Sequence, residues 1–329
     1  MRVLVTGASG FIGRHLVPAL AAADMTVTAA ARDPAVLPAS WKARDASGSG
    51  QVRTAAQPSL AALGGQDQSD GARDAWRAII DGQDVVVHLA GIAHVGTGVP
   101  EADVMAVNAR GPGELALLCA ATGVHFIHFS SVKAQTDAVS PQLITEDDQP
   151  TPAELYGRAK LRGEQLIAQA GGSHTIMRPV LVYGDGVKGN MAALRRLAAS
   201  PLPLPIGGLT ARRSLLGISN LCDAVVWAVQ KRARASRNAV FLLADADPMT
   251  VPEMIAAMRA GLGRSARLVT VPQGALRQVA RLAGKQAAFE RMSGPLVVST
   301  ARLTAAGWTA PVHVADGLAR FAAQSTSPA

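Results

Sequence analysis

The stretch Val3-Leu-Val-Thr-Gly7-Ala-Ser-Gly10-Phe-Ile-Gly13 decides the fold of this chain. Its apolar start predicts a strand, and glycines at every third position predict a tight turn that leads into a helix. A β-carbon at these glycines would hinder the turn, the approach of a pyrophosphate and the packing of the helix on the strand. The first N–H groups of the helix also favour phosphate. We therefore predict a dinucleotide-binding unit, with Phe11 and Ile12 beside the glycines as cofactor contacts.

The rest of the first half repeats this alternation of strand and helix. Further strands are predicted at Val27–Ala30, Val85–Leu89 and Phe126–Phe129, and helices at Arg14–Ala23, Asp74–Ile80 and Gly113–Ala121. Alternating strands and helices predict a parallel sheet covered on both faces, which is a Rossmann-type doubly wound α/β fold. Residues 38–71 show little periodicity, and no element can be placed there.

The sequence pattern changes after Tyr183. The segment Pro201-Leu-Pro-Leu-Pro predicts extended chain, Pro248–Leu262 a helix and Leu268–Val271 a strand. We expect residues 1–182, with about 214–245, to form the dinucleotide-binding domain. Residues from about 183 to 213 and 246–329 then form a smaller C-terminal α/β lobe that binds the substrate.

The composition excludes several classes of protein. Hydrophobic residues make up 49% of the chain and charged residues 17%, which is enough to bury a core. No signal peptide and no run of about 20 apolar residues is visible, so we expect a cytoplasmic protein without membrane insertion. The net charge of +8 is dispersed, which argues against nucleic-acid binding. Cys119 and Cys222 lie in apolar segments and predict buried free thiols, with no metal site.

The end of the second predicted strand bears on the choice of cofactor. An NAD site usually has an acidic residue there, which binds the ribose 2′-hydroxyl. Here Ala31 takes that position and Arg32 follows. Because an arginine can pair with a 2′-phosphate, the sequence slightly favours NADP. Asp33 keeps NAD open.

The motif Tyr156-Gly-Arg-Ala-Lys160 is the candidate catalytic pair. Thr151 and Glu154 form a capping-box pattern that predicts the start of a helix just before it. Residues four apart share a helix face, so the two side chains should meet. The ammonium of Lys160 should lower the phenol's pKa from its usual value of about 10 and allow general acid–base chemistry.

Two upstream strands end in small or hydroxyl-bearing residues. They read Val85-Val-Val-His-Leu-Ala90-Gly91 and Phe126-Ile-His-Phe-Ser130-Ser131. Ligands of parallel sheets bind at the carboxyl ends of such strands. A serine there can bind the reacting oxygen and stabilise its charge.

The order of glycine turn, His-Leu-Ala-Gly, Ser-Ser and YxxxK resembles that of the extended short-chain dehydrogenase/reductases, the NAD(P)-dependent nucleotide-sugar epimerase/dehydratase family. The resemblance implies a triad of Ser131, Tyr156 and Lys160, with Ser131 rather than Ser130 at the family's Thr or Ser position. It also implies that Asn108 supports the sheet and the cofactor pocket. The other implied cofactor contacts are Leu89, Ala90, Gly91, Tyr156, Lys160 and Pro179.

The second half extends the resemblance to the substrate. The segment Met177-Arg-Pro-Val-Leu-Val-Tyr183-Gly-Asp-Gly-Val-Lys-Gly-Asn190 looks like the RPxxVYGxG signature of nucleotide-sugar epimerases. The resemblance implies that Arg213 contacts the substrate diphosphate and Asn190 a polar group of the nucleotide sugar. Lys133 stands where the dehydratases have an acidic residue, which argues against dehydratase activity and makes Lys133 a candidate substrate contact.

The resemblance is strongest to bacterial UDP-N-acetylhexosamine 4-epimerases and 4-keto-6-deoxy-sugar reductases. An epimerase oxidises C4 of the sugar and returns the hydride to the other face, whereas a reductase delivers hydride from NADPH once. Both outcomes stay open, with the epimerase placed first. A non-catalytic NADP-binding sensor is the alternative from another class. The family also implies a homodimer that forms through helices near residues 105–120 and 155–170.

Overall fold

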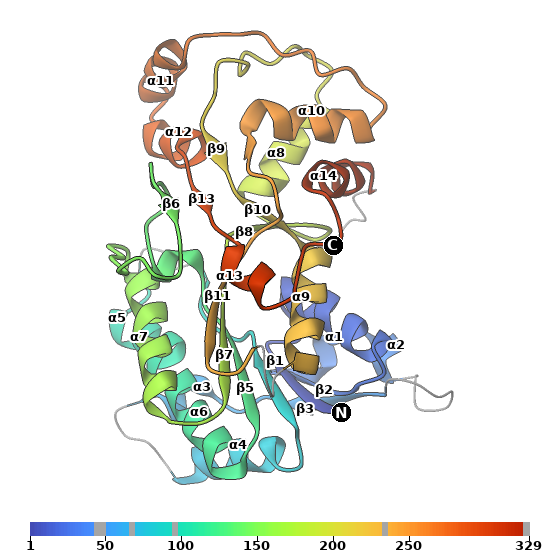
Figure 1. Ribbon diagram of the computed structural model, residues 1–329, viewed down its shortest axis with the longest axis vertical. Helices are drawn as coiled ribbons and strands as arrows, with labels where there is room; N and C mark the ends of the chain where they lie inside the picture. Colours follow the sequence, from blue (N-terminus) through green and yellow to red (C-terminus); the bar gives the residue numbers. More distant parts are fainter. Residues whose placement is uncertain (43–50, 66–69, 94–97, 232–235, 325–329) are drawn as a thin grey trace.

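A seven-stranded sheet forms the centre of the protein (Figure 1). The computed structural model describes residues 1–42, 51–65, 70–93, 98–231 and 236–324. The strand order is β3-β2-β1-β4-β5-β7-β11, and every pairing is parallel. The strands are β1 (Arg2–Thr6), β2 (Thr26–Ala31), β3 (Val52–Ala56), β4 (Val85–His88), β5 (His125–Phe129), β7 (His174–Pro179) and β11 (Ala239–Leu243). The prediction of a Rossmann-type doubly wound fold is confirmed.

Helices cover both faces of this sheet, because its central strands β1, β4 and β5 are buried on both sides. Helices α1 (Phe11–Ala22) and α9 (Ile218–Lys231) pack on one hydrophobic core. Helices α3 (Leu60–Leu63), α4 (Asp70–Ile80), α6 (Gly111–Thr122) and α7 (Leu155–Gln169) contribute to a second core on the other face. Helix α5 (Glu101–Met105) continues into α6 through a π-helical segment, Ala106–Arg110.

The stretch that the sequence left unassigned contains α2 (Ala39–Lys42), β3 and α3. Only Val52 of β3 is buried, because β3 is the outermost strand of the sheet. An edge strand with one buried side chain has no alternating apolar pattern, which explains why the sequence did not reveal it. Residues 43–50 and 66–69 of the stretch lie outside the described residues.

The second half adds a smaller lobe with a hydrophobic core of its own. Helices α8 (Asn190–Ala199), α10 (Val251–Gly261) and α14 (Val314–Ala323) surround this core. The remaining helices and strands are β6 (Leu143–Ile144), β8 (Leu181–Tyr183), β9 (Arg212–Arg213), β10 (Leu215–Gly217), β12 (Met249–Thr250), β13 (Val297–Val298), α11 (Gln273–Leu282), α12 (Gln286–Ser293) and α13 (Ala301–Ala305). Of these, β6, β13 and α13 contribute Ile144, Val298 and Leu303 to the core on the sheet rather than to the core of the lobe. None of the described helices is long and apolar enough to cross a membrane.

Two predictions for this lobe have different outcomes. The helix predicted at Pro248–Leu262 is confirmed by α10, which begins with a capping box between Thr250 and Glu253. The strand predicted at Leu268–Val271 is wrong, since only Leu268 forms an isolated bridge, with Leu204. Its neighbour is the segment Pro201–Pro205, whose prolines have no N–H group with which to build a ladder.

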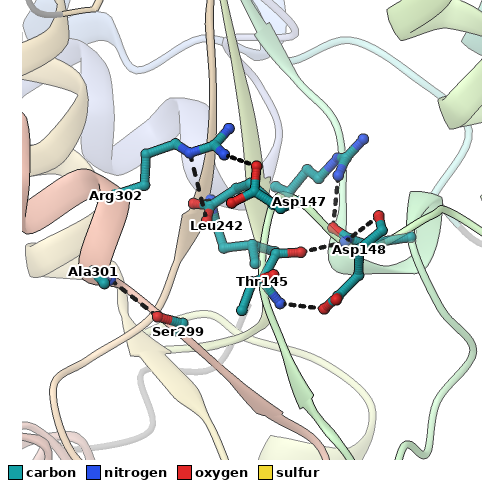
Figure 2. Close-up of polar contacts among 10 residues, drawn as sticks. Thr145, Asp147, Asp148, Leu242, Ser299, Ala301 and Arg302 are labelled. Atoms are coloured by element: carbon teal, nitrogen blue, oxygen red, sulfur yellow. Dashed lines mark hydrogen bonds and ion pairs between the residues drawn. The ribbon is translucent and has the colours of Figure 1, made fainter.

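The edge of the sheet at β11 is covered by the loop 145–148. The N–H group of Leu242 donates to Glu146 Oε1 at 2.9 Å. Arg302 of α13 forms ion pairs with both Glu146 and Asp147. Figure 2 shows Arg302 of α13 in contact with Asp147 of this loop. These contacts occupy polar groups that an open strand edge would expose.

Candidate active site

The glycine turn closes tightly on the end of β4. Gly7 has a φ of +67°, and a β-carbon there would lie 2.8 Å from the backbone nitrogen of Ala90. At Gly13 a β-carbon would lie 2.6 Å from Ala8 Cα, so only glycine lets α1 approach β1. Helix α1 begins at Phe11 after Gly10, and its first turn carries no acidic side chain. The turn therefore fits a pyrophosphate.

The sheet order places this turn at a switch point. From β1 the chain proceeds to β2 and β3 on one side, and β4 starts the other half of the sheet. Ligands of such sheets bind in the crevice at the carboxyl ends of these strands. The segment Leu89–Gly91 follows β4 at this point. Asn108 Oδ1 accepts the N–H of Ile92 and Asn108 Nδ2 donates to Ile92 O, both at 2.9 Å, so Asn108 holds this segment in place.

The three side chains of the implied triad gather at the ends of β4 and β5. Tyr156 lies near Ser131, whose hydroxyl acts to lower the pKa of the phenol. Lys160 is 5% exposed, and its Nζ donates to Phe129 O at 2.8 Å. The same Nζ lies 3.5 Å from the position of a β-carbon at Gly91. The structure thus brings phenol, hydroxyl and ammonium to the crevice beside the glycine turn.

Ser130 points to another partner. Its hydroxyl donates to the carboxylate of Glu164 in the interior. Ser131 instead caps a short 3-10 turn, in which its Oγ accepts the N–H of Lys133 at 3.2 Å. Of the two adjacent serines, the geometry places Ser131 beside Tyr156.

The prediction that Lys160 lowers the pKa of the Tyr156 phenol is wrong for the protein without a bound ligand. Burial raises the pKa of Tyr156 to about 12, and the hydroxyl of Ser131 offsets only part of this rise. Burial lowers the pKa of Lys160 to about 8, against the opposing effect of the Glu164 carboxylate. Desolvation of both groups outweighs the attraction on which the expectation rested. Tyr156 accordingly keeps its proton at neutral pH and is ready to act as an acid.

The predicted start of the catalytic helix is also wrong. Helix α7 begins at Leu155, with Glu154 rather than Thr151 at the N-cap and no side-chain cap. The carboxylate of Glu154 cannot form the capping box, because it is held by Lys133 Nζ at 2.6 Å. Asp137 Oδ1 accepts the N–H of Glu154 at 3.4 Å and fixes the entry of the chain.

The remaining candidate residues differ in whether their side chains already bind other groups of the protein. Lys133 is paired with Glu154, as described above. Arg213 donates to Ala138 O at 3.1 Å and to Gly294 O. Asn190, the first residue of α8, and Arg32, which follows β2, are exposed. Pro179 is buried at the end of β7.

Comparison with known proteins decides the family. Residues 3–244 match the profile of the NAD dependent epimerase/dehydratase family. The chain belongs to this family. UDP-glucose 4-epimerase from Vibrio cholerae is 34% identical over 251 residues, which cover 72% of this chain and 75% of that protein. This epimerase/dehydratase family member is thus an NAD(P)-dependent enzyme of the extended short-chain dehydrogenase/reductase type, as the sequence motifs indicated.

Two further relatives of this epimerase/dehydratase family member are informative. The dTDP-4-dehydrorhamnose reductase of Mycolicibacterium smegmatis is 34% identical over 203 residues, covering 60% of this chain and 51% of that protein. The solved structure of UDP-glucuronic acid 4-epimerase from Bacillus cereus in complex with NAD has a TM-score of 0.71 at 20% identity. The match covers 99% of this chain and 100% of that one, and it shows a shared fold.

The sequence did not predict a buried ion pair of this epimerase/dehydratase family member. Arg178 of β7 donates to both carboxylate oxygens of Glu164, at 3.0 and 2.5 Å, and to Gln135 Oε1 at 2.6 Å. The two charged side chains are 6% and 5% exposed. Gln135 Nε2 in turn donates to Asp148 O at 3.1 Å, in the loop that Figure 2 shows. An arginine inside an apolar strand was the signal, since it requires a buried partner.

Two buried histidines lie behind Lys160. His88 and His128 are fully buried on neighbouring strands, and their rings stack at 5.6 Å. His88 Nδ1 bonds Thr6 Oγ1 at 2.8 Å, but His88 Nε2 and both ring nitrogens of His128 have no partner among the described residues. Burial, together with the charge of Lys160, lowers the pKa of His88 to about 3 and that of His128 well below its usual value. Both rings are therefore neutral.

Replacing His128 with phenylalanine should raise the stability of the enzyme. The change keeps an aromatic ring beside Phe126 and removes two unpaired buried nitrogens, each of which costs about 1–3 kcal/mol. We expect a net gain of about 1 kcal/mol in the free energy of urea unfolding, since the larger ring offsets part of the benefit. The matched control is His125→Phe, which should destabilise because the His125 nitrogens bond Ser173 and Thr175. Loss of stability in both variants would refute the prediction.

Proposed function

We propose that this enzyme is an NAD(P)-dependent 4-epimerase of a nucleotide sugar, most simply a UDP-hexose or UDP-N-acetylhexosamine, that works through a transient 4-keto sugar. The observation that carries the proposal is the meeting of Ser131, Tyr156 and Lys160 beside the glycine turn. The similarity to the Vibrio cholerae UDP-glucose 4-epimerase supports the choice of substrate.

Each residue has a role that follows from its position. The glycine turn and the start of α1 hold the pyrophosphate of the cofactor, and Lys160 holds its ribose. A nicotinamide cofactor held there would supply the hydride chemistry, since its ring can accept a hydride from the sugar and give it back. Tyr156 accepts the proton of the C4 hydroxyl and gives it back, while Ser131 binds the reacting oxygen. Burial raises the pKa of the Tyr156 phenol. Tyr156 can therefore accept the proton of the C4 hydroxyl only if a nearby positive charge lowers that pKa.

We place the nucleotide sugar between the sheet and the small lobe formed by residues of about 183–213 and 246–329. Asn190 is exposed at the start of α8, where its amide can bind a polar substrate group. Arg213 is held by two carbonyl groups, but a guanidinium has five N–H donors. The donors beyond those two bonds can bind the diphosphate. Lys133, in its pair with Glu154, is a further substrate contact.

A specific observation favours reduction as the second candidate function. Strand β2 ends at the buried Ala31, and the exposed Arg32 follows it. This arrangement suits the 2′-phosphate of NADPH. The protonated state of Tyr156 also suits a one-way reduction of a 4-keto-6-deoxy sugar, in which the phenol acts only as an acid. Homodimer formation, a cytoplasmic location and the absence of nucleic-acid binding stay predictions of the sequence.

Cofactor extraction and a turnover assay separate these functions. For an epimerase, the purified enzyme should release NAD on denaturation and convert UDP-glucose or UDP-N-acetylglucosamine to its C4 epimer without net change in NADH absorbance. Consumption of one NADPH per 4-keto sugar, with no epimer formed, would instead establish the reductase. Binding of NADPH without turnover of either substrate would contradict both and favour the sensor.

A further inference from the structure

Helix α11 stands at the end of the small lobe that is far from the sheet (Figure 1). None of its residues is buried. Val279 is 65% exposed and Leu282 is 89% exposed, the highest value for a large hydrophobic residue in the described part of the chain. Isolated exposed leucines are ordinary, but a group of them on one helix marks an interaction surface.

One apolar residue of α11 packs against the protein, and three others are exposed to solvent. Leu276 packs against the core of the small lobe. Ala275, Val279 and Leu282 are three or four residues apart and share a different side of the helix, which is exposed. The helix is thus already anchored to its lobe and still has an apolar face without a partner among the described residues.

The exposed apolar surface continues in the segment that precedes α11. Val269 is 50% exposed and Leu202 is 65% exposed. Their two segments run side by side, since the N–H of Val269 donates to Leu204 O at 2.8 Å. The connection between α10 and α11 passes over the same end of the lobe as α11 (Figure 1). We call Leu202, Val269, Val279 and Leu282 the apolar tip.

The segment that contains Val269, Val279 and Leu282 is strongly basic. Between Glu253 and Glu290 the chain has six basic residues and no acidic one. Five of the six are exposed, namely Arg264, Arg267, Arg277, Arg281 and Lys285. Such a surface is complementary to a partner that is apolar inside and anionic outside. Nucleic acid fits less well, because the described part of the tip offers aliphatic side chains where single strands require aromatic ones.

We propose that the apolar tip and the basic residues around it dock the enzyme on the surface of an anionic lipid bilayer. Val279 and Leu282 enter the boundary between headgroups and acyl chains, while the arginines reach the headgroup phosphates with their long side chains. The docked enzyme would lie on the membrane without crossing it. This inference does not depend on which nucleotide sugar the active site takes.

Co-sedimentation with vesicles tests the proposal. The full-length enzyme should bind vesicles that contain phosphatidylglycerol and phosphatidylcholine, should bind phosphatidylcholine alone far less, and should be released by high salt. The double variant Val279→Ser/Leu282→Ser should bind at least about tenfold more weakly, because it removes two side chains that enter the bilayer. Arg281→Gln should cost about fivefold.

The control variant is Val36→Ser. Val36 is 50% exposed, lies next to β2 and is outside the apolar tip, so the change should not alter vesicle binding. Turnover of a soluble nucleotide sugar should be equal in all variants, which separates docking from catalysis. No binding of the wild-type enzyme to anionic vesicles, or equal binding of the double variant, would overturn the proposal. The proposal would also be overturned if the double variant lost self-association or nucleic-acid binding but still bound vesicles as the wild-type enzyme does.

Discussion

Tyr156→Phe should lower kcat by about 10²- to 10⁴-fold while the enzyme stays folded and binds its cofactor. In the proposed mechanism the phenol is the group that exchanges a proton with the reacting oxygen, while Ser131 binds that oxygen and Lys160 holds the cofactor ribose. The loss should appear in kcat because the hydroxyl acts on the transition state rather than on substrate binding. Turnover of the UDP-sugar or 4-keto sugar proposed above gives kcat, and fluorescence measures binding of the cofactor.

The second tyrosine of the chain provides the matched control. Tyr183 is also buried, and its hydroxyl donates to Asp245 Oδ2 at 2.9 Å, away from the triad. Tyr183→Phe should cost about 1 kcal/mol of stability through this lost hydrogen bond and leave kcat within about twofold. If Tyr156→Phe kept near wild-type turnover, or if both variants lost activity equally, the assignment of Tyr156 as acid–base would fail.

The parts of the site that the sequence predicts are those set by local chain geometry. Gly7 must be a glycine because of its positive φ and its closeness to Ala90, and this requirement is visible as a motif. Tyr156 and Lys160 share a helix face whatever the tertiary structure. The strands that carry Ser131 and Gly91 are apolar on both faces because they lie in the middle of the sheet.

The parts that the sequence did not predict depend on contacts between distant segments. The start of α7 moved from Thr151 to Leu155 because Lys133 took the carboxylate that a capping box requires. The pKa of Tyr156 rose because burial, which a motif does not report, exceeded the influence of nearby charge. Strand β3 was missed because only one of its side chains is buried. In each case tertiary structure overrode a correct local rule.

Among the contacts that the sequence did not predict, the ion pair of Arg178 with Glu164 has the largest expected effect on stability. Replacing Arg178 with methionine should cost about 3–5 kcal/mol in the free energy of unfolding, because it leaves the Glu164 carboxylate buried without a counter-ion. Gln135 Oε1 also loses the hydrogen bond that Arg178 Nη1 donates to it. Urea unfolding followed by circular dichroism gives this free energy.

Two comparisons show whether the cost comes from the uncompensated charge. Arg77→Met removes an ion pair with Asp74 on the exposed face of α4, and it should cost less than about 1 kcal/mol. The double variant Arg178→Met/Glu164→Leu removes both charges and should recover a large part of the loss, since an apolar pair is often as stable as a buried ion pair. A double variant no more stable than Arg178→Met alone would show that the network acts through its hydrogen bonds to Gln135 and Ser130. Because Glu164 is four residues from Lys160 and raises its pKa, both buried variants should also shift the pH dependence of turnover.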